Sequence, residues 1–144
     1  MTSVAATVPN VEASGTFVVA DFTPVPLADA PVVTGAPVGL ATMTKTFEGD
    51  ISGTAATLFT AAYDPETGVG TYVAMESFEG RLHDRAGTFN FAHSATTSGT
   101  DRQHEFFVIV PGSGTGELAG ISGAGALEID ADGTHHVELD YSFE

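Results

Sequence analysis

Short segments in which apolar and polar residues alternate follow one another along most of the chain. An alternation with a period of two is typical of a half-buried β-strand, and no segment shows a sustained apolar pattern at helical spacing. The pattern therefore predicts an all-β chain of about eight antiparallel strands. We expect these strands over residues 11–22, 40–49, 51–62, 70–80, 87–97, 103–111, 116–130 and 134–143.

Turn-forming residues separate the predicted strands and indicate how the sheet is arranged. Glu48-Gly49-Asp50 predicts a tight hairpin, and Pro65 with Gly68 suits the turn at 64–68. The first and last strands are both long and half apolar, so as free edges they would be prone to aggregate. Pairing them with each other or with another neighbour would remove those edges, and the glycines at 120, 123 and 125 allow the bending that closure needs. We therefore predict a closed antiparallel β-barrel of about eight strands.

The length of 144 residues fits one domain. Residues 1–10 show no periodicity and are expected to form a frayed lead, which leaves 11–144 as a single barrel domain. Prolines at 24, 26, 31 and 37 exclude helix interiors and central strands, so 23–37 is predicted to be a long loop. Long loops in compact domains often serve function. We expect this loop to lie over one mouth of the barrel as a lid.

Composition and charge exclude several classes of function. The chain carries 4 Lys plus Arg against 19 Asp plus Glu, a net charge of −15, which would repel nucleic-acid backbones and anionic membrane surfaces. We interpret these acids as groups that keep the barrel soluble. The chain has no cysteine for a disulfide or a thiolate nucleophile. No signal peptide or membrane span is predicted, so the expected location is the cytoplasm.

Metal, phosphate and hydrolytic chemistry are not predicted. His135 and His136 are adjacent in a strand and point to opposite faces, and no two histidines are spaced i, i+2. The run 112–116 looks like a Gly-rich phosphate cradle but lacks the Lys-Ser/Thr ending, so we interpret it as a turn between strands. The chain also has no Gly-x-Ser-x-Gly nucleophile elbow. We therefore expect no metal and no cofactor.

The candidate chemistry lies on strand faces that point into the barrel. On strand 70–80, Tyr72 and Glu76 share one face. We favour that face as inward, although the opposite face with Val73 and Met75 is nearly as apolar. An inward Glu76 would lie among aromatic groups, where desolvation would raise its pKa toward general-acid or general-base duty.

The later strands complete the predicted lining. Phe89, Phe91 and His93 share a face that we expect to be inward, and His93 is either a structural histidine or a second acid–base group. Phe106 and Tyr141 are expected to face the same interior from strands 103–111 and 134–143. The predicted catalytic residues are Glu76 and His93, and the predicted substrate-binding residues are Tyr72, Phe89, Phe91, Phe106 and Tyr141.

Lys45 is the only lysine of the chain, and it shares a strand face with Met43 and Phe47. It could be buried with a carboxylate such as Glu76, an arrangement that is costly unless it is well hydrogen-bonded. It could also face solvent, with its aliphatic stem covering Phe47. We favour the solvent-facing orientation.

Several motifs occur in order between Ser14 and the C-terminus, and the most specific is Pro-Gly-Ser-Gly-Thr-Gly-Glu-Leu at 111–118. They resemble a bacterial family of uncharacterised small proteins that is related in fold to the allene oxide cyclase and dirigent barrels. The resemblance implies the eight-stranded barrel, and the structural relatives bind an apolar, reactive molecule and steer its ring closure or coupling by shape. One departure is Phe22, where the family carries a Trp near the end of the first strand. The other motifs are 44–50, 87–89 with His93, 110–120 and 139–141.

These features lead to one preferred function and two alternatives. We expect a cofactor-free cyclase or isomerase that folds a hydrophobic, polyketide- or lipid-like substrate inside the barrel, in natural-product biosynthesis. The first alternative is a non-catalytic barrel that binds or carries a small apolar metabolite. The second is a filled barrel that serves as an oligomerisation module, and a homodimer is left open. The expected partner is thus a small hydrophobic molecule, and neither nucleic acid nor a membrane.

Overall fold

A computed structural model describes residues 10–144, and every regular element in that range is a β-strand. The prediction of an all-β chain is confirmed, and the predicted strand positions agree closely with those observed. The frayed lead predicted for 1–10 lies, except for Asn10, outside the described residues. The strands are β1 (Val11–Val25), β2 (Val38–Gly49), β3 (Ile51–Tyr63), β4 (Gly70–Leu82), β5 (Arg85–Thr97), β6 (Gln103–Ile109), β7 (Thr115–Gly116), β8 (Ile121–Ile129) and β9 (His135–Phe143).

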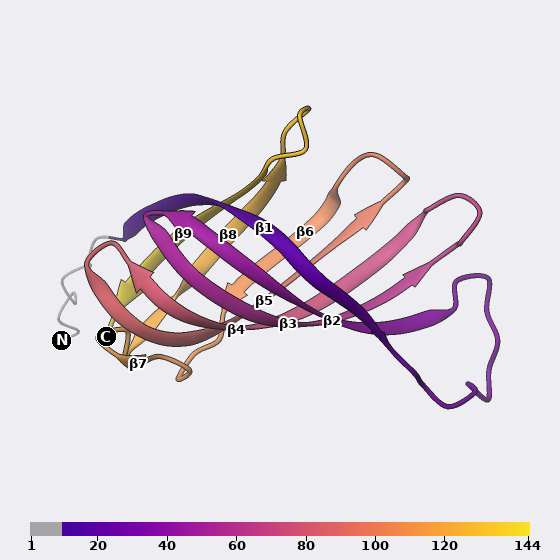
Figure 1. The fold of residues 1–144 in the computed structure, drawn as a ribbon, viewed down its shortest axis with the longest axis horizontal. Helices are drawn as coiled ribbons and strands as arrows, with labels where there is room; N and C mark the ends of the chain where they lie inside the picture. The colour runs from indigo at the N-terminus through magenta and orange to yellow at the C-terminus, as the bar shows by residue number, and fades with distance from the viewer. Residues whose placement is uncertain (1–9) are drawn as a thin grey trace, which may run out of the picture.

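The strands form one antiparallel sheet whose pairings run in a ring (Figure 1). The order is β4–β3–β2–β1–β9–β8–β6–β5, and β5 pairs again with β4. The two-residue β7 pairs with β5 beside this ring. The expected pairing of the terminal strands is confirmed, because Val11–Phe17 of β1 lies antiparallel to His135–Tyr141 of β9.

The prediction of a closed barrel does not hold, because the ring is weak between β6 and β8. These strands pair only through Val108 with Ala124 and Ile109 with Gly123. Beyond these pairs the β5–β6 and β8–β9 hairpins end well apart (Figure 1). The ring of Phe107 lies against Gly125, where an added Cβ would come within 2.9 Å of it. Gly125, which has no side chain, leaves room for this ring against the β8 backbone.

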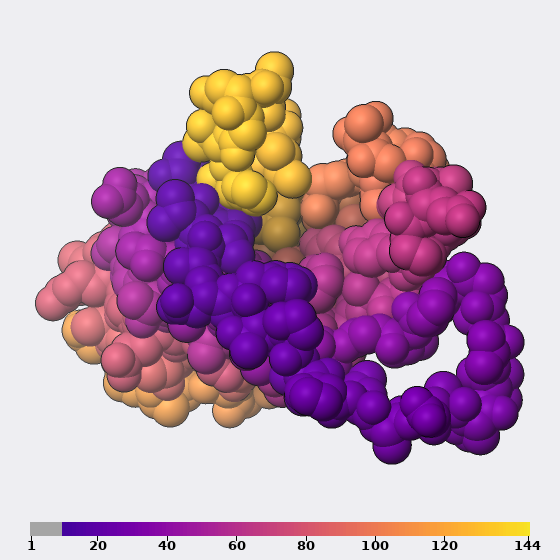
Figure 2. All heavy atoms as spheres, turned by 45° about the vertical axis from the view of Figure 1, so that its right-hand side comes forward, coloured from indigo at the N-terminus to yellow at the C-terminus, as the bar shows by residue number. Residues whose placement is uncertain are grey.

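The proline-rich segment begins later than predicted. A bulge between Ala20 and Thr23 keeps β1 paired with β2 as far as Val25, and Pro24 lies opposite Ala41. Pro24 is tolerated there because β9 pairs only with the first half of β1, so its missing N–H faces a free strand edge. The loop over 26–37 stands away from the rest of the molecule (Figure 2), and its residues are almost all exposed.

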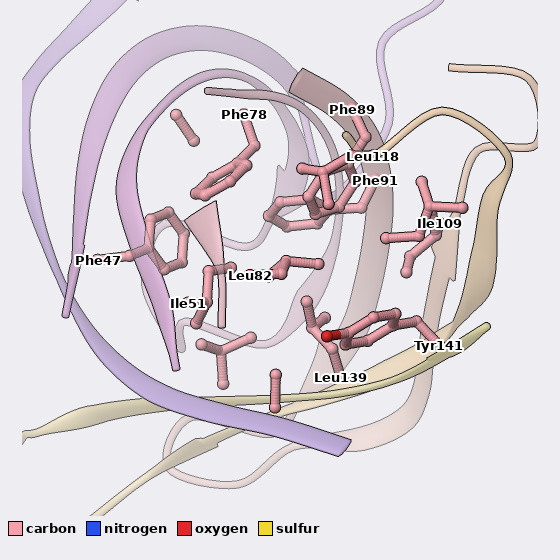
Figure 3. Close-up of a cluster of buried hydrophobic side chains, with 14 of the residues drawn as sticks. Phe47, Ile51, Phe78, Leu82, Phe89, Phe91, Ile109, Leu118, Leu139 and Tyr141 are labelled. Atoms are coloured by element: carbon pink, nitrogen blue, oxygen red, sulfur yellow. The ribbon is translucent and has the colours of Figure 1, made fainter. Parts of the chain in front are cut away.

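The interior of one end of the sheet is filled by apolar side chains that point inward from most of the strands (Figure 3). Phe47 and Phe78 meet edge to face with centroids 5.6 Å apart, and Phe91 stacks on Phe107 at 5.0 Å. Burial of this much apolar surface is the main stabilising contribution to such a fold. A smaller cluster of Tyr72, Ala74 and Ala95 lies toward the other end.

The observed burial decides the strand orientations that the sequence left open. Tyr72 and Glu76 face inward, with exposed fractions of 7% and 0%, whereas Val73 and Met75 are exposed, so the favoured orientation of 70–80 is confirmed. The solvent-facing orientation of Lys45 is wrong, because this side chain is buried with its neighbours Met43 and Phe47.

The predicted inward orientation of Phe106 is also wrong. Phe106 is 51% exposed, and Phe107 and Ile109 of the same strand are buried instead. The register explains the inversion, since Ile109 pairs with Phe91 and Phe107 with His93, and residues that pair in a sheet point to the same side.

The close approach of β3 and β4 at Gly53 and Gly80 gives a stability prediction. A Cβ at position 80 would lie 2.1 Å from the Ser52 carbonyl oxygen, a clash with backbone that only a shift of the strands can relieve. We expect Gly80→Ala to lower the free energy of unfolding by about 1–3 kcal/mol, measured by urea denaturation. Gly39→Ala is the matched control, because nothing lies within 4 Å of its Cβ position. Equal stabilities of the two variants would contradict this close approach.

Candidate functional site

A group of polar side chains lies in the interior, between the large apolar cluster and the smaller one. Lys45, Thr57, Glu76 and His93 are all buried, and they come from the neighbouring strands β2, β3, β4 and β5. The alternation of each strand places them there, because each follows an inward residue two positions away. Burying a charge is expensive unless it is paired and hydrogen-bonded, so the contacts of this group decide whether it is tolerated.

Glu76 is the centre of these contacts. Its Oε2 accepts hydrogen bonds from Lys45 Nζ and from His93 Nε2, the latter at 2.6 Å, and its Oε1 accepts one from Thr57 Oγ1 at 2.5 Å. Burial would raise the pKa of Glu76, but these hydrogen bonds and the charge of Lys45 outweigh it and lower that pKa below its usual range. The predicted raised pKa is therefore wrong, and Glu76 is a carboxylate that holds its partners in place.

The hydrogen bonds of His93 define which ring nitrogen carries its proton. Burial lowers the pKa of His93, so the imidazole is neutral at pH 7. Because the Glu76 carboxylate can only accept, Nε2 carries the hydrogen. His93 Nδ1 is then an acceptor, and Tyr72 Oη donates to it at 2.8 Å. Glu76 thus fixes His93 in the tautomer that can receive a proton from Tyr72.

Arg102 and Glu105 extend this chain of contacts to the open end of the sheet. Arg102 Nη2 donates to Tyr72 Oη at 3.0 Å, and its Nε donates to Glu105 Oε1 at 2.7 Å. Burial raises the pKa of Tyr72, and the hydrogen bond from Arg102 offsets this only in part, so the phenol is neutral at pH 7. We call the hydrogen-bonded series Lys45–Glu76–His93–Tyr72–Arg102 the relay.

The relay reaches a surface cleft between the β5–β6 and β8–β9 hairpins, with a volume of about 810 Å³. The cleft is visible as a hollow beside the yellow β8–β9 hairpin in Figure 2. Tyr63, Tyr72 and Arg102 line one wall, and Leu127 and Ile129 line the other. A cavity of about 40 Å³ beside it reaches His93 and shares Arg102 and Leu127 with the cleft. Tyr72 and Arg102 are therefore the relay members that can meet a bound molecule.

The predicted site residues fall into two groups. Tyr72, Glu76 and His93 come together in the relay, although Glu76 is fully buried and does not line the cleft. Phe89, Phe91 and Tyr141 belong to the packed apolar cluster, where neighbouring side chains surround them. The predicted lid is not observed, because the lining of the cleft within the described range 10–144 includes no residue of 23–37.

Sequence reasoning missed Thr57, Arg102 and Glu105, and it weighed a buried Lys45–Glu76 pair but favoured a solvent-facing lysine. A lone lysine on a strand face between Met43 and Phe47 was the available signal for the buried pair. Thr57 lies directly opposite Glu76 in the register, but threonine is common in strands and gives no signal by itself. Arg102 precedes β6 in a turn, where no periodicity predicts the orientation of a side chain.

Within 10–144 no three His, Cys, Asp or Glu side chains gather in a group that could hold a metal ion. In the same range no helix is long and apolar enough to cross a membrane.

The fold and the relay define an all-β protein with an acid–base chain that ends at a cleft. A sequence profile described as "Protein of unknown function (DUF3224)" matches residues 13–141, and the chain belongs to this family. A crystal structure of a protein with unknown function from the DUF3224 family of Shewanella oneidensis MR-1 is 32% identical, with a TM-score of 0.79. The match covers 94% of this chain and 98% of that chain. No curated protein sequence matches significantly.

Proposed function

We propose that this protein is a cofactor-free isomerase or cyclase that moves a proton on a small, largely apolar carbonyl compound bound in the cleft. The observation that carries the proposal is the relay, in which a cleft-lining tyrosine donates to a neutral histidine held by a buried carboxylate. Perturbed titratable groups beside a cleft are typical of catalytic sites. The packed phenylalanines support a substrate in the cleft rather than within the apolar cluster.

The relay supports a proton transfer in two balanced steps. As Tyr72 Oη takes a proton from the carbon next to the substrate carbonyl, its own proton passes to His93 Nδ1. The electron pair of the broken C–H bond delocalises onto the carbonyl oxygen and gives an enolate. The negative oxygen of this enolate can accept a hydrogen bond from Arg102. The imidazolium of His93 is stabilised by Glu76, and it returns the proton through Tyr72 to another atom of the substrate. The net result is an isomerisation. It is a ring closure if the enolate carbon attacks a second carbonyl of the same molecule, whose π bond breaks and whose oxygen then receives the proton through Tyr72.

A relationship in fold to the allene oxide cyclase and dirigent barrels, and a function in biosynthesis, belong to the same proposal. The ring of eight strand pairings supports that relationship. In those barrels shape steers a reactive molecule, and orientation alone can lower a barrier by roughly 7–11 kcal/mol. The alternative of a non-catalytic carrier needs the cleft but not the relay. A carrier would bind a ligand without speeding hydrogen exchange at its carbon atoms, whereas an isomerase would speed it.

Hydrogen exchange at the carbon next to a carbonyl tests the proposal without knowledge of the natural substrate. A panel of cyclic and aryl ketones is incubated with the protein in D₂O, and deuterium incorporation is followed by NMR and mass spectrometry. We expect exchange above the buffer rate for ketones that bind, and a loss of at least about 100-fold in His93→Gln. Ketones that raise the melting temperature without faster exchange would contradict the isomerase and favour the carrier.

A further inference from the structure

The side chains around the cleft carry one cation and four carboxylates. Arg102 is the cation, and the acids are Asp101, Glu105, Glu128 and Asp130. Arg102 forms an ion pair with Glu105 at 2.7 Å and also donates to Tyr72. Its charge is therefore compensated within the wall of the cleft, and a bound anion would have to compete with Glu105 for it.

The other three carboxylates have no lysine or arginine as a partner among the described residues. Hydrogen bonds from the backbone and hydroxyl of Ser98 and from Gln103 lower the pKa of Asp101 to about 2 and leave it charged at neutral pH. Asp130 accepts a hydrogen bond from His136 at 2.6 Å. The side chain of Glu128 makes no hydrogen bond or ion pair in the described part of the chain. Three acidic groups thus line the cleft without a lysine or arginine to compensate their charge.

Such an arrangement discriminates between ligands by charge. Clefts lined by one sign of charge focus the field and raise the local concentration of ligands of the opposite sign. They also reject ligands of the same sign, since specificity often rests on a repulsive element as much as on an attractive one. The net charge of −15 acts in the same direction over the whole surface.

We propose that the cleft takes an apolar molecule that carries a positively charged amine, and that it excludes carboxylates and phosphates of the same shape. This proposal rests on the proposed function, because it names the substrate class of the same cleft. The apolar body contacts Tyr63, Leu127 and Ile129, and the amine faces Asp130 and Glu128. A fatty acid or a phosphorylated metabolite is thereby excluded as the substrate.

Two matched series of probes test this charge selection. The naphthyl series is 2-naphthylmethylamine, 2-naphthalenemethanol and 2-naphthoate, and the linear series is octylamine, 1-octanol and octanoate. Affinities are measured by calorimetry at neutral pH and low salt. We expect the amine to bind on the order of 10-fold tighter than the alcohol, with the carboxylate weakest in each series, and the differences to shrink in about 0.5 M salt because of screening.

A pair of double variants distinguishes the effect of the charges in the cleft from the effect of the overall negative charge of the protein. Glu128→Gln with Asp130→Asn removes two charges from the cleft, and Glu48→Gln with Glu79→Gln removes two from exposed positions outside it. We expect the first variant to lose most of the preference for the amine and the second to keep it. Equal affinities within a series, a preference for the carboxylate, or equal effects of the two variants would overturn the charge selection and leave the relay standing. If no probe binds at all, the cleft fails as a binding site, and both proposals fail with it.

Discussion

Glu76→Ala should destabilise the protein by about 3–5 kcal/mol, the largest effect on stability that we expect from a single substitution. The variant leaves Lys45 buried with an exposed fraction of 5% and without the carboxylate that accepts its hydrogen bond. His93 and Thr57 lose their partner at the same time. Urea denaturation measures the loss, and the melting temperature should fall by about 10 °C.

Two control variants show whether the loss comes from the unpaired charge. Glu79→Ala removes an exposed carboxylate from the same strand and should change stability by less than about 0.5 kcal/mol. Lys45→Met combined with Glu76→Leu removes both charges, and a buried ion pair replaced by apolar groups often costs little. The double variant should therefore be more stable than Glu76→Ala alone. If it is less stable, the cost lies in lost packing and not in the charge.

Tyr72→Phe should lower the rate of exchange at the substrate carbon by roughly 100-fold to 10,000-fold, which is the effect typical of a lost acid–base group. The variant removes only the hydroxyl that connects the cleft with His93 Nδ1. Its ring should stay in place, because it stacks on Phe59 with centroids 5.2 Å apart. Affinity for the apolar probes should change by less than about threefold, since the lining of the cleft is otherwise kept.

Tyr63→Phe is the matched control for this loss. Tyr63 lines the same cleft, but its hydroxyl makes no hydrogen bond to the relay within the described residues. We expect its exchange rate to stay within about threefold of the wild type. If both variants lost the same share of the exchange rate, the hydroxyls would act through solvation of the cleft. The proposed proton transfer from Tyr72 to His93 would then be wrong.

The sequence predicted the strands well because their alternation and their turns are local signals. Turn residues such as Gly49 and Gly68 mark the ends of strands, and the terminal strands β1 and β9 pair as expected. The inward orientation of β4 was also predictable in outline, since it placed Tyr72 and Phe78 in the interior. The strands and their turns depend on residues close to one another in the chain, whereas the pairing of β1 with β9 followed from two long apolar edges that each need a partner.

The remaining features depend on contacts between distant segments. The inward face of β6 is inverted relative to the prediction because its register with β5 pairs Phe107 with His93 and Ile109 with Phe91, and a local pattern does not define that register. The opening between β6 and β8 lies between two segments that no local pattern relates. The predicted rise in the pKa of Glu76 followed from burial alone. Its pKa is lowered instead by the hydrogen bond from His93 and by Lys45, whose inward orientation only the whole sheet decides.

The relay predicts a specific protonation state for His93, and this state is the most direct test of the account. NMR of ¹⁵N-labelled histidine should show a neutral His93 at pH 7 with its proton on Nε2. Because burial lowers its pKa, the ring should remain neutral as the pH falls below the ordinary value of 6.5. The Nδ1 signal should change in Tyr72→Phe, which removes the hydrogen bond to it. A His93 that is charged at pH 7, or that carries its proton on Nδ1, could not accept a proton from Tyr72 and would contradict the proposed function.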